Sequence, residues 1–227
     1  MLTSGWPAGF RMPVSITFVQ ETPSGIPHVS KREPASCAFW KLALTEGTFY
    51  ATVEDHFGCP IGAHVQGLSL PDESARQLDE MQQMMLNLGY LTPTSLAQIP
   101  RLQKKWTAVV YAPLDKALLF PDVVLFLGNA RQLMLLFEAA QLAGLPVLPL
   151  TGRPACSMIP TVLDGQGIVT NLGCIGNRVY TQILDDEFYA AIPGTYLAAL
   201  ERALPQIWQA NCQLESYHCG RKSLVMV

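Results

Sequence analysis

The sequence has few charged residues and no basic cluster. Charged side chains make up 15% of the 227 residues, and the net charge is -3; a typical soluble domain carries about 25% charged residues. Adjacent Lys and Arg residues occur only as pairs, such as Lys104-Lys105 and Arg221-Lys222. Nothing here favours a nucleic-acid partner. A large core or a buried interface in a homo-oligomer would account for the low charge.

The sequence also lacks a long uninterrupted apolar run. The most apolar region, 108–150, is broken by charged residues and by four prolines, whereas a membrane-spanning helix needs about 20 consecutive apolar residues. The segment 1–10 lacks the basic start and apolar core of a secretory signal. We therefore expect a cytoplasmic protein without a membrane partner. In that compartment the six cysteines are expected to be thiols or metal ligands rather than disulfides.

Familiar catalytic and cofactor motifs are missing as well. The sequence contains no dinucleotide fingerprint, no P-loop, no His-Glu-x-x-His, no Gly-x-Ser-x-Gly and no paired Cys-x-x-Cys knuckle. Gly128-Asn129 follows an apolar run and precedes a helical pattern. Asn129 is thus a candidate contact for a phosphate or carboxylate at a helix start.

The hydrophobic pattern predicts a mixture of strands and helices. Expected strands span 14–19, 48–53, 108–112, 123–127, 146–150 and 165–170; expected helices span 37–44, 72–88, 130–143, 174–183 and 194–210. The order strand 123–127, helix 130–143, strand 146–150 favours a parallel βαβ unit. Residues 185–193 are expected to form a connection, Pro205 to kink or split the last helix, and the tail from Cys212 to be disordered.

One short pattern occurs twice. Residues 58–65 read Gly-Cys-Pro-Ile-Gly-Ala-His-Val and residues 173–179 read Gly-Cys-Ile-Gly-Asn-Arg-Val. Without Pro60, both become Gly-Cys-Ile-Gly-x-basic-Val, and each follows another cysteine, Cys37 or Cys156. We infer an α/β (or α+β) fold with an internally duplicated mixed sheet and a pseudo-two-fold axis. The chain, 1–227, is expected to be a single compact domain built from related halves (13–70 and 122–193), a linker helix (72–89) and a C-terminal helix (194–210).

Four segments carry a resemblance to a known family. They read Cys-Ala-Phe-Trp-Lys-Leu-Ala (37–43), Phe-Gly-Cys-Pro-Ile-Gly-Ala (57–63), Pro-Asp-Val-Val-Leu-Phe-Leu-Gly-Asn (121–129) and Leu-Gly-Cys-Ile-Gly-Asn-Arg (172–178). From about Pro13 to about Pro193 the chain resembles the ArCR-like family known as domain of unknown function 169. The resemblance implies a bacterial or archaeal cytosolic setting and no particular activity.

The repeated cysteines suggest a shared site. If the halves face a common axis, Cys37, Cys59, Cys156 and Cys174 converge between them, and four thiolates suit a [4Fe–4S] cluster or, alternatively, zinc. Helix starts would favour thiolates. Metal-free reactive thiols and inert packing are the alternatives.

Other candidate residues surround these cysteines. His64 and Arg178 occupy matching repeat positions and would stabilise an anionic cluster or bind a small anionic ligand. His56 is a spare metal ligand, and Cys212 with Cys219 would form a minor site. Leu78, Met81 and Met85 recur at helical spacing, which favours a core stripe over an adaptable binding face.

Three functional hypotheses follow. The first is a metal- or iron–sulfur-binding protein with a redox role or a role assisting a partner enzyme. The second is an enzyme or anion-binding protein that uses Cys59 or Cys174 as a metal-free thiolate. The third is an interaction subunit. The sequence does not decide whether the protein is an enzyme.

Overall fold

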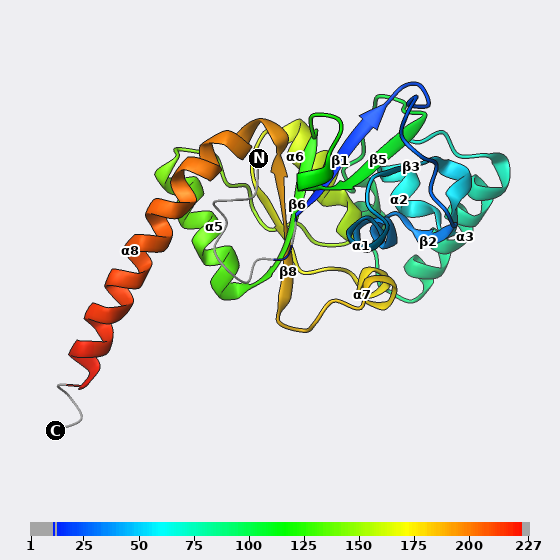
Figure 1. Cartoon of the computed structure of the whole chain (residues 1–227). Helices are drawn as coiled ribbons and strands as arrows, with labels where there is room; N and C mark the ends of the chain where they lie inside the picture. The colour runs from blue at the N-terminus through cyan, green and yellow to red at the C-terminus, as the bar shows by residue number, and fades with distance from the viewer. Residues whose placement is uncertain (1–10, 12, 224–227) are drawn as a thin grey trace.

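A six-stranded sheet forms the centre of the computed structural model, which describes residue 11 and residues 13–223 (Figure 1). The strand order is β3-β5-β1-β6-β8-β7, and every neighbouring pair is antiparallel. The strands are β1 (Val14–Val19), β3 (Phe49–Ala51), β5 (Ala108–Pro113), β6 (Val123–Asn129), β7 (Val169–Asn171) and β8 (Glu187–Pro193). A separate parallel pair joins β2 (Glu33–Ala35) to β4 (His56–Cys59). The expectation of a single mixed α/β domain is confirmed.

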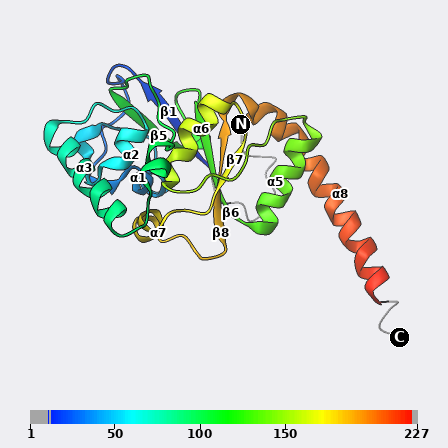
Figure 2. The same ribbon diagram turned by 180° about the vertical axis from the view of Figure 1, so that it is seen from behind.

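Helices surround this sheet and extend beyond it. They are α1 (Ser36–Glu46), α2 (Pro60–Val65), α3 (Asp72–Asn87), α4 (Pro93–Ala97), α5 (Ala130–Leu142), α6 (Met158–Gly165), α7 (Ile175–Thr181) and α8 (Leu197–Ser223), with short 3-10 turns η1 (Val53–Asp55), η2 (Leu114–Lys116), η3 (Ala155–Ser157) and η4 (Gly194–Tyr196). Helices α2 and α3 lie at one end, and α5 and α8 at the other (Figures 1 and 2). Among the described residues, no helix combines the length and the apolarity needed to cross a bilayer.

Alternation along the central strands creates two cores. Val123 and Leu125 of β6 pack on the face that holds α1 and α6, whereas Val124 and Phe126 pack on the face that holds α5 and α8. This is the period of two that a strand imposes on its side chains. Each fully buried side chain of this size contributes about 1.5–3 kcal/mol. Burial on both faces therefore fixes the register of β6.

The strand order reads symmetrically from the centre. β1 and β6 are the middle pair, β5 and β8 flank them, and β3 and β7 form the edges. In each half a helix follows the first strand, α1 after β1 and α5 after β6. A cysteine-bearing segment follows each edge strand, with Cys59 after β3 and Cys174 after β7. Strand β5 lies outside the first half, 13–70, that the repeat predicts, so the two halves and the duplication stay a prediction.

Three expectations about single elements are wrong. Within residues 146–150 a single isolated bridge forms, between Val147 and Ile168, because Pro146 and Pro149 lack the N–H donors of a regular strand. The parallel βαβ unit therefore does not form. Residues 187–193, expected to be a connection, form β8 between β6 and β7. Helix α8 continues past Pro205 to Ser223, so the tail is not disordered from Cys212.

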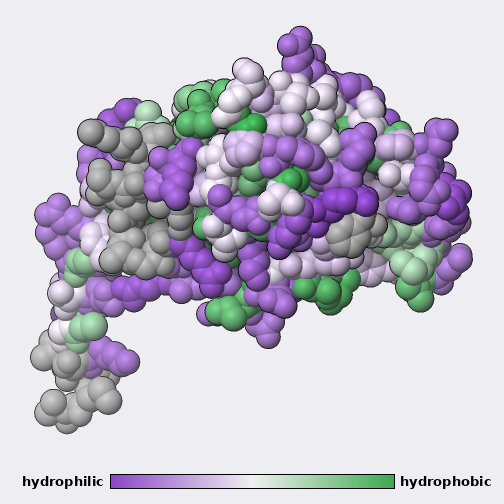
Figure 3. Space-filling view, turned by 45° about the vertical axis from the view of Figure 1, so that its right-hand side comes forward, coloured by the Kyte–Doolittle hydropathy of each residue, from purple (hydrophilic) through white to green (hydrophobic). Residues whose placement is uncertain are grey.

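The visible surface does not present one broad apolar face. In the view of Figure 3, hydrophobic residues form separate patches among hydrophilic ones. A homo-oligomer stays a prediction.

Gly194 offers a test of the packing at the end of β8. A Cβ at this position would lie 1.8 Å from the backbone oxygen of Pro121, and the Gly194 N–H donates to the Asp122 oxygen at 3.0 Å. Since backbone cannot yield cheaply, we expect Gly194→Ala to lower the free energy of unfolding by about 1–3 kcal/mol or more. Gly152→Ala, where a Cβ meets nothing within 4 Å, is the control. Urea unfolding at pH 7.5 that leaves both variants equally stable contradicts this packing.

Candidate functional site

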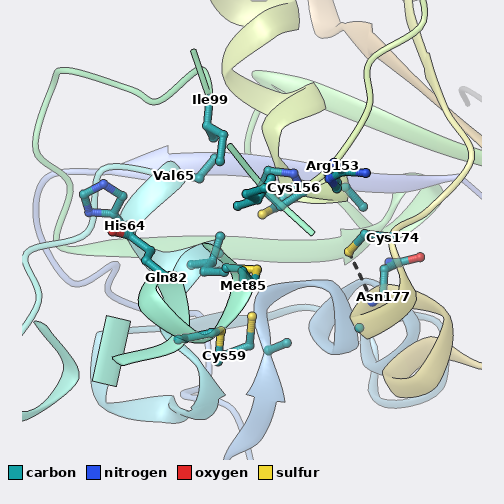
Figure 4. Close-up of a pocket in the computed structure, with 18 of the residues that line it drawn as sticks. Cys59, His64, Val65, Gln82, Met85, Ile99, Arg153, Cys156, Cys174 and Asn177 are labelled. Atoms are coloured by element: carbon teal, nitrogen blue, oxygen red, sulfur yellow. Dashed lines mark hydrogen bonds between the residues drawn. The ribbon is translucent and has the colours of Figure 1, made fainter. Parts of the chain in front are cut away.

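A cavity of about 880 Å³ lies beside the sheet and is lined by two groups of elements. The first group is the beginnings of α1, α2 and α7 and the turn η3. The second is α3, α4 and the segments that follow them. Figure 4 shows side chains from both groups around the same space. We call this space the cavity.

All four cysteines of the repeat line the cavity, each at the beginning of a helical segment. Cys37 is the second residue of α1, Cys59 and Cys174 are the N-cap residues of α2 and α7, and Cys156 lies in η3 before α6. The two halves therefore contribute to one locus. The thiols lie near enough to influence one another, since, beyond the larger effect of burial, Cys59, Cys174 and Cys37 each raise the pKa of Cys156.

The predicted four-cysteine metal centre is wrong. Among the residues that the structure describes, no three His, Cys, Asp or Glu side chains are grouped so that they could hold a metal ion. Thiolates bound to one zinc ion must each lie about 2.3 Å from it, and the described cysteine side chains form no such group. The corresponding cofactors, a [4Fe–4S] cluster or zinc, stay a prediction for which the described residues offer no site.

Burial determines the protonation of the thiols. It raises the pKa of Cys37 to about 12 and raises the pKa of Cys156 well above 9.0. The pKa of Cys59 is also raised by burial, although backbone N–H groups of Gly62 and Ile61 partly offset that effect. These three side chains are therefore neutral thiols at pH 7. The expected preference for thiolate at a helix start is outweighed by desolvation, which argues against Cys59 as a thiolate nucleophile.

The α3 wall of the cavity is apolar and adaptable. Leu78, Met81 and Met85 line it at the spacing of one helical face, but only Leu78 is buried. The stripe expected to be core thus faces the cavity instead of packing solidly against the sheet. Methionine side chains are flexible and polarizable, so this wall can adjust to an apolar molecule.

The charged residues that line the cavity are both cationic. They are Arg101 and Arg153, and among the described residues the lining includes no Asp or Glu. The Arg153 guanidinium lies 4.4 Å from the centroid of the Tyr90 ring, which holds it by a cation–π contact. Arg153 forms no ion pair with any residue that the structure describes. Its hydrogen-bond donors are therefore available to an anion.

His64 belongs to the same cationic edge. Its Nε2 lies 3.3 Å from Arg101 Nη1, and it lines the cavity, while its role as a ligand contact stays a prediction. Burial lowers the pKa of His64, and the nearby charges of Arg101 and Lys105 lower it further. The neutral ring therefore accepts a hydrogen bond from Arg101 and helps to orient that guanidinium.

Arg178 and Asn129 lie outside the cavity lining. Arg178 donates to the carbonyl oxygens of Leu184 and Leu172 at 3.1 and 2.7 Å, and so holds the loops that flank α7. Asn129 accepts from the Gln132 N–H at 3.0 Å and caps α5. Their roles as ligand contacts stay untested predictions.

The remaining sequence candidates have other positions. Cys212 and Cys219 are exposed on α8. His56 is buried and hydrogen-bonds Ser36.

Sequence reasoning missed Arg101, Arg153 and Tyr90. Arg153 directly precedes Pro154-Ala155-Cys156 in the second cysteine segment, which was the available signal. Tyr90 and Arg101 lie in the segments on either side of α4. Their position at the cavity depends on how these segments pack in the folded protein. No local pattern marks it.

His56 gives the site a dependence on pH. Burial lowers its pKa below the ordinary 6.5, so the unfolded chain binds the proton more readily. The resulting stability is complete above pH 6.5 and is lost as pH falls through the lower folded pKa, by up to about 1.4 kcal/mol per pH unit.

We expect the free energy of unfolding, measured in urea between pH 7.5 and 5.5, to fall less steeply in His56→Asn than in the wild type. The exposed His218 supplies the control variant His218→Asn, which should keep the wild-type slope. Identical slopes for all three proteins would show that His56 is not buried as a neutral ring.

Comparisons with known proteins agree with the sequence resemblance. The model of the family DUF169, described as uncharacterised ArCR, matches residues 11–203. An uncharacterised protein of Methanocaldococcus jannaschii, MJ0308, is 26% identical over 210 residues, covering 83% of this chain and 84% of that protein. No solved structure matches the chain. The family match spans most of the chain, cavity included, and the chain therefore belongs to the DUF169 family of uncharacterised ArCR proteins.

Proposed function

We propose that the protein binds a small amphiphilic anion, a molecule with an apolar body and one carboxylate or phosphate group, inside the cavity. The observation that carries the proposal is an apolar lining that includes two arginines and no acidic side chain. The volume, about 880 Å³, falls within the range of about 300–1,000 Å³ that is usual for small-molecule sites. The proposal keeps the cytoplasmic location and the small anionic ligand expected from the sequence.

The apolar body would lie along α3. Leu78, Met81 and Met85 present carbon and sulfur atoms to the cavity and offer no charged group. Removing apolar ligand surface from water contributes about 25 cal/mol per Å². An apolar chain or ring system in contact with this wall gains affinity, and the flexible methionines tolerate some variation in its shape.

The acidic group would bind Arg153. This guanidinium is oriented by Tyr90 and has no carboxylate partner among the described residues. Because Arg presents a planar fork of N–H donors, it matches a carboxylate or phosphate in two parallel hydrogen bonds. Arg101, held against His64, supplies a second positive charge on the cavity edge.

Removal of the Arg153 charge tests the anion. A hydrogen bond to a charged group is worth about 1.5–3 kcal/mol, so we expect Arg153→Gln to weaken decanoate binding about 10- to 100-fold in isothermal titration calorimetry. Decanol binding should be unchanged. Arg76→Gln is the matched control, since Arg76 lies on α3 but pairs with Glu73 and Glu80 outside the cavity. Equal affinity of wild type and Arg153→Gln for decanoate would remove Arg153 from the site.

Ligand length tests the apolar wall. Each buried methylene contributes about 0.8 kcal/mol, so the affinity for straight-chain carboxylates should rise roughly fourfold per added carbon from hexanoate to decanoate. The rise should stop when the chain fills the cavity. Affinities that do not depend on chain length would show that only the charged group is bound, and would contradict a role for the α3 wall.

A further inference from the structure

A serine and a histidine form a buried pair at the cavity. Ser36, 1% exposed, lines the cavity as the first residue of α1, and His56, 7% exposed, lies beside it in β4. The Ser36 Oγ and His56 Nε2 atoms are 2.8 Å apart. The other ring nitrogen, Nδ1, lies 3.0 Å from the backbone oxygen of Thr52.

These contacts determine the tautomer of the ring. A carbonyl oxygen only accepts hydrogen bonds, so Nδ1 must carry the hydrogen that it shares with Thr52. In the neutral ring Nε2 is then the acceptor, and the Ser36 hydroxyl donates its hydrogen to Nε2. Burial lowers the pKa of His56, which keeps the ring in this neutral, proton-accepting form at pH 7.

The surroundings leave the Ser36 hydroxyl committed to His56. The N-cap residue of α1 is Ala35, whose side chain makes no capping hydrogen bond. The N–H groups in the first turn of α1 are therefore not capped by the Ala35 side chain. At Gly62 an added Cβ would lie 2.5 Å from Ser36 Oγ. Only glycine therefore leaves room for the hydroxyl in its present position.

We propose that Ser36 and His56 are a nucleophile and a general base that hydrolyse carboxylic esters whose apolar acyl group occupies the cavity. The arrangement has the three parts that an activated nucleophile requires, which are a hydroxyl, a base within hydrogen-bond reach, and a third group that orients the base. This inference rests on the proposed function only in placing an apolar molecule in the cavity.

The reaction proceeds in two balanced steps. Ser36 Oγ forms a bond to the ester carbonyl carbon while its proton passes to His56 Nε2. The bond to the alcohol oxygen then breaks, and the alcohol leaves with the proton from Nε2. Water adds to the acyl-serine, giving its proton to Nε2, which returns it to Ser36 Oγ as the carboxylic acid is released. The N–H groups of the first turn of α1, which have no partner inside the helix, would donate to the negative charge on the carbonyl oxygen.

The chemistry also fits the charges of the cavity. Hydrolysis of such an ester produces a carboxylate with an apolar body, which is the class of anion that Arg153 and the α3 wall are proposed to bind. The alcohol part of the ester does not need to carry a charge. Substrate and product would thus share the apolar wall and differ in their contact with Arg153.

Covalent labelling tests the pair directly. Folded wild-type protein is treated with an octyl fluorophosphonate, and intact mass and peptide mapping locate the adduct. We expect one adduct per chain, on Ser36, and none after unfolding in urea. Ser36→Ala should remove the adduct, whereas Ser157→Ala should keep it, since Ser157 is a buried serine beside the matching Cys156. Hydrolysis of p-nitrophenyl octanoate should fall at least 100-fold in Ser36→Ala and should depend on a base titrating below pH 6.5 in the wild type.

The outcomes separate this inference from the binding proposal. No adduct on Ser36 of the folded wild type overturns the inference, as does an adduct or hydrolysis that persists in Ser36→Ala. If Ser36→Ala does not fold, the mapped adduct on the wild type alone decides. Decanoate binding without labelling leaves the binding proposal standing and the ester hydrolysis refuted. Labelling of Ser36 without decanoate binding supports the ester hydrolysis and refutes the binding proposal.

Discussion

The antiparallel pairing of β1 with β6 is the constraint on which the site depends. This pair joins the amino-terminal and carboxyl-terminal halves at the centre of the sheet, with Val14 opposite Leu125. Helix α1 packs in the same core as Met158 and Val162 of α6. The cysteine-bearing helix starts of the two halves are consequently brought to one cavity. Loss of the pairing between β1 and β6 would separate the cysteine-bearing helix starts of the two halves.

Desolvation then decides what the cavity can do. It keeps Cys37, Cys156 and Cys59 as neutral thiols and His56 as a neutral base. Arg153 is exposed at the cavity, so its effect on ligand choice comes from its planar fork of N–H donors rather than from removal of water. Apolar walls with cationic groups and no acidic side chain favour an amphiphilic anion over a metal ion.

Much of the fold could be predicted from local pattern. Strand β1 alternates, β5 and β6 are short continuous apolar runs, and helices α3 and α5 have strong helical periodicity, so their positions followed from the sequence. Strand β8 was missed because Ala190 and Ala191 have weak strand propensity, and its place depends on pairing with β6 and β7. The common position of the four cysteines followed from the repeat. The lack of a metal-holding group among the described cysteines and the contact between Ser36 and His56 both depend on packing between segments, for which the sequence has no local signal.

A crystal structure of the protein with decanoate would show whether an amphiphilic anion binds in the cavity between the α3 wall and Arg153. We expect density for the carboxylate within hydrogen-bond distance of the Arg153 guanidinium, and for the alkyl chain against Met81 and Met85. Density for decanoate at another place, or a cavity filled by the protein's own side chains, would contradict this expectation.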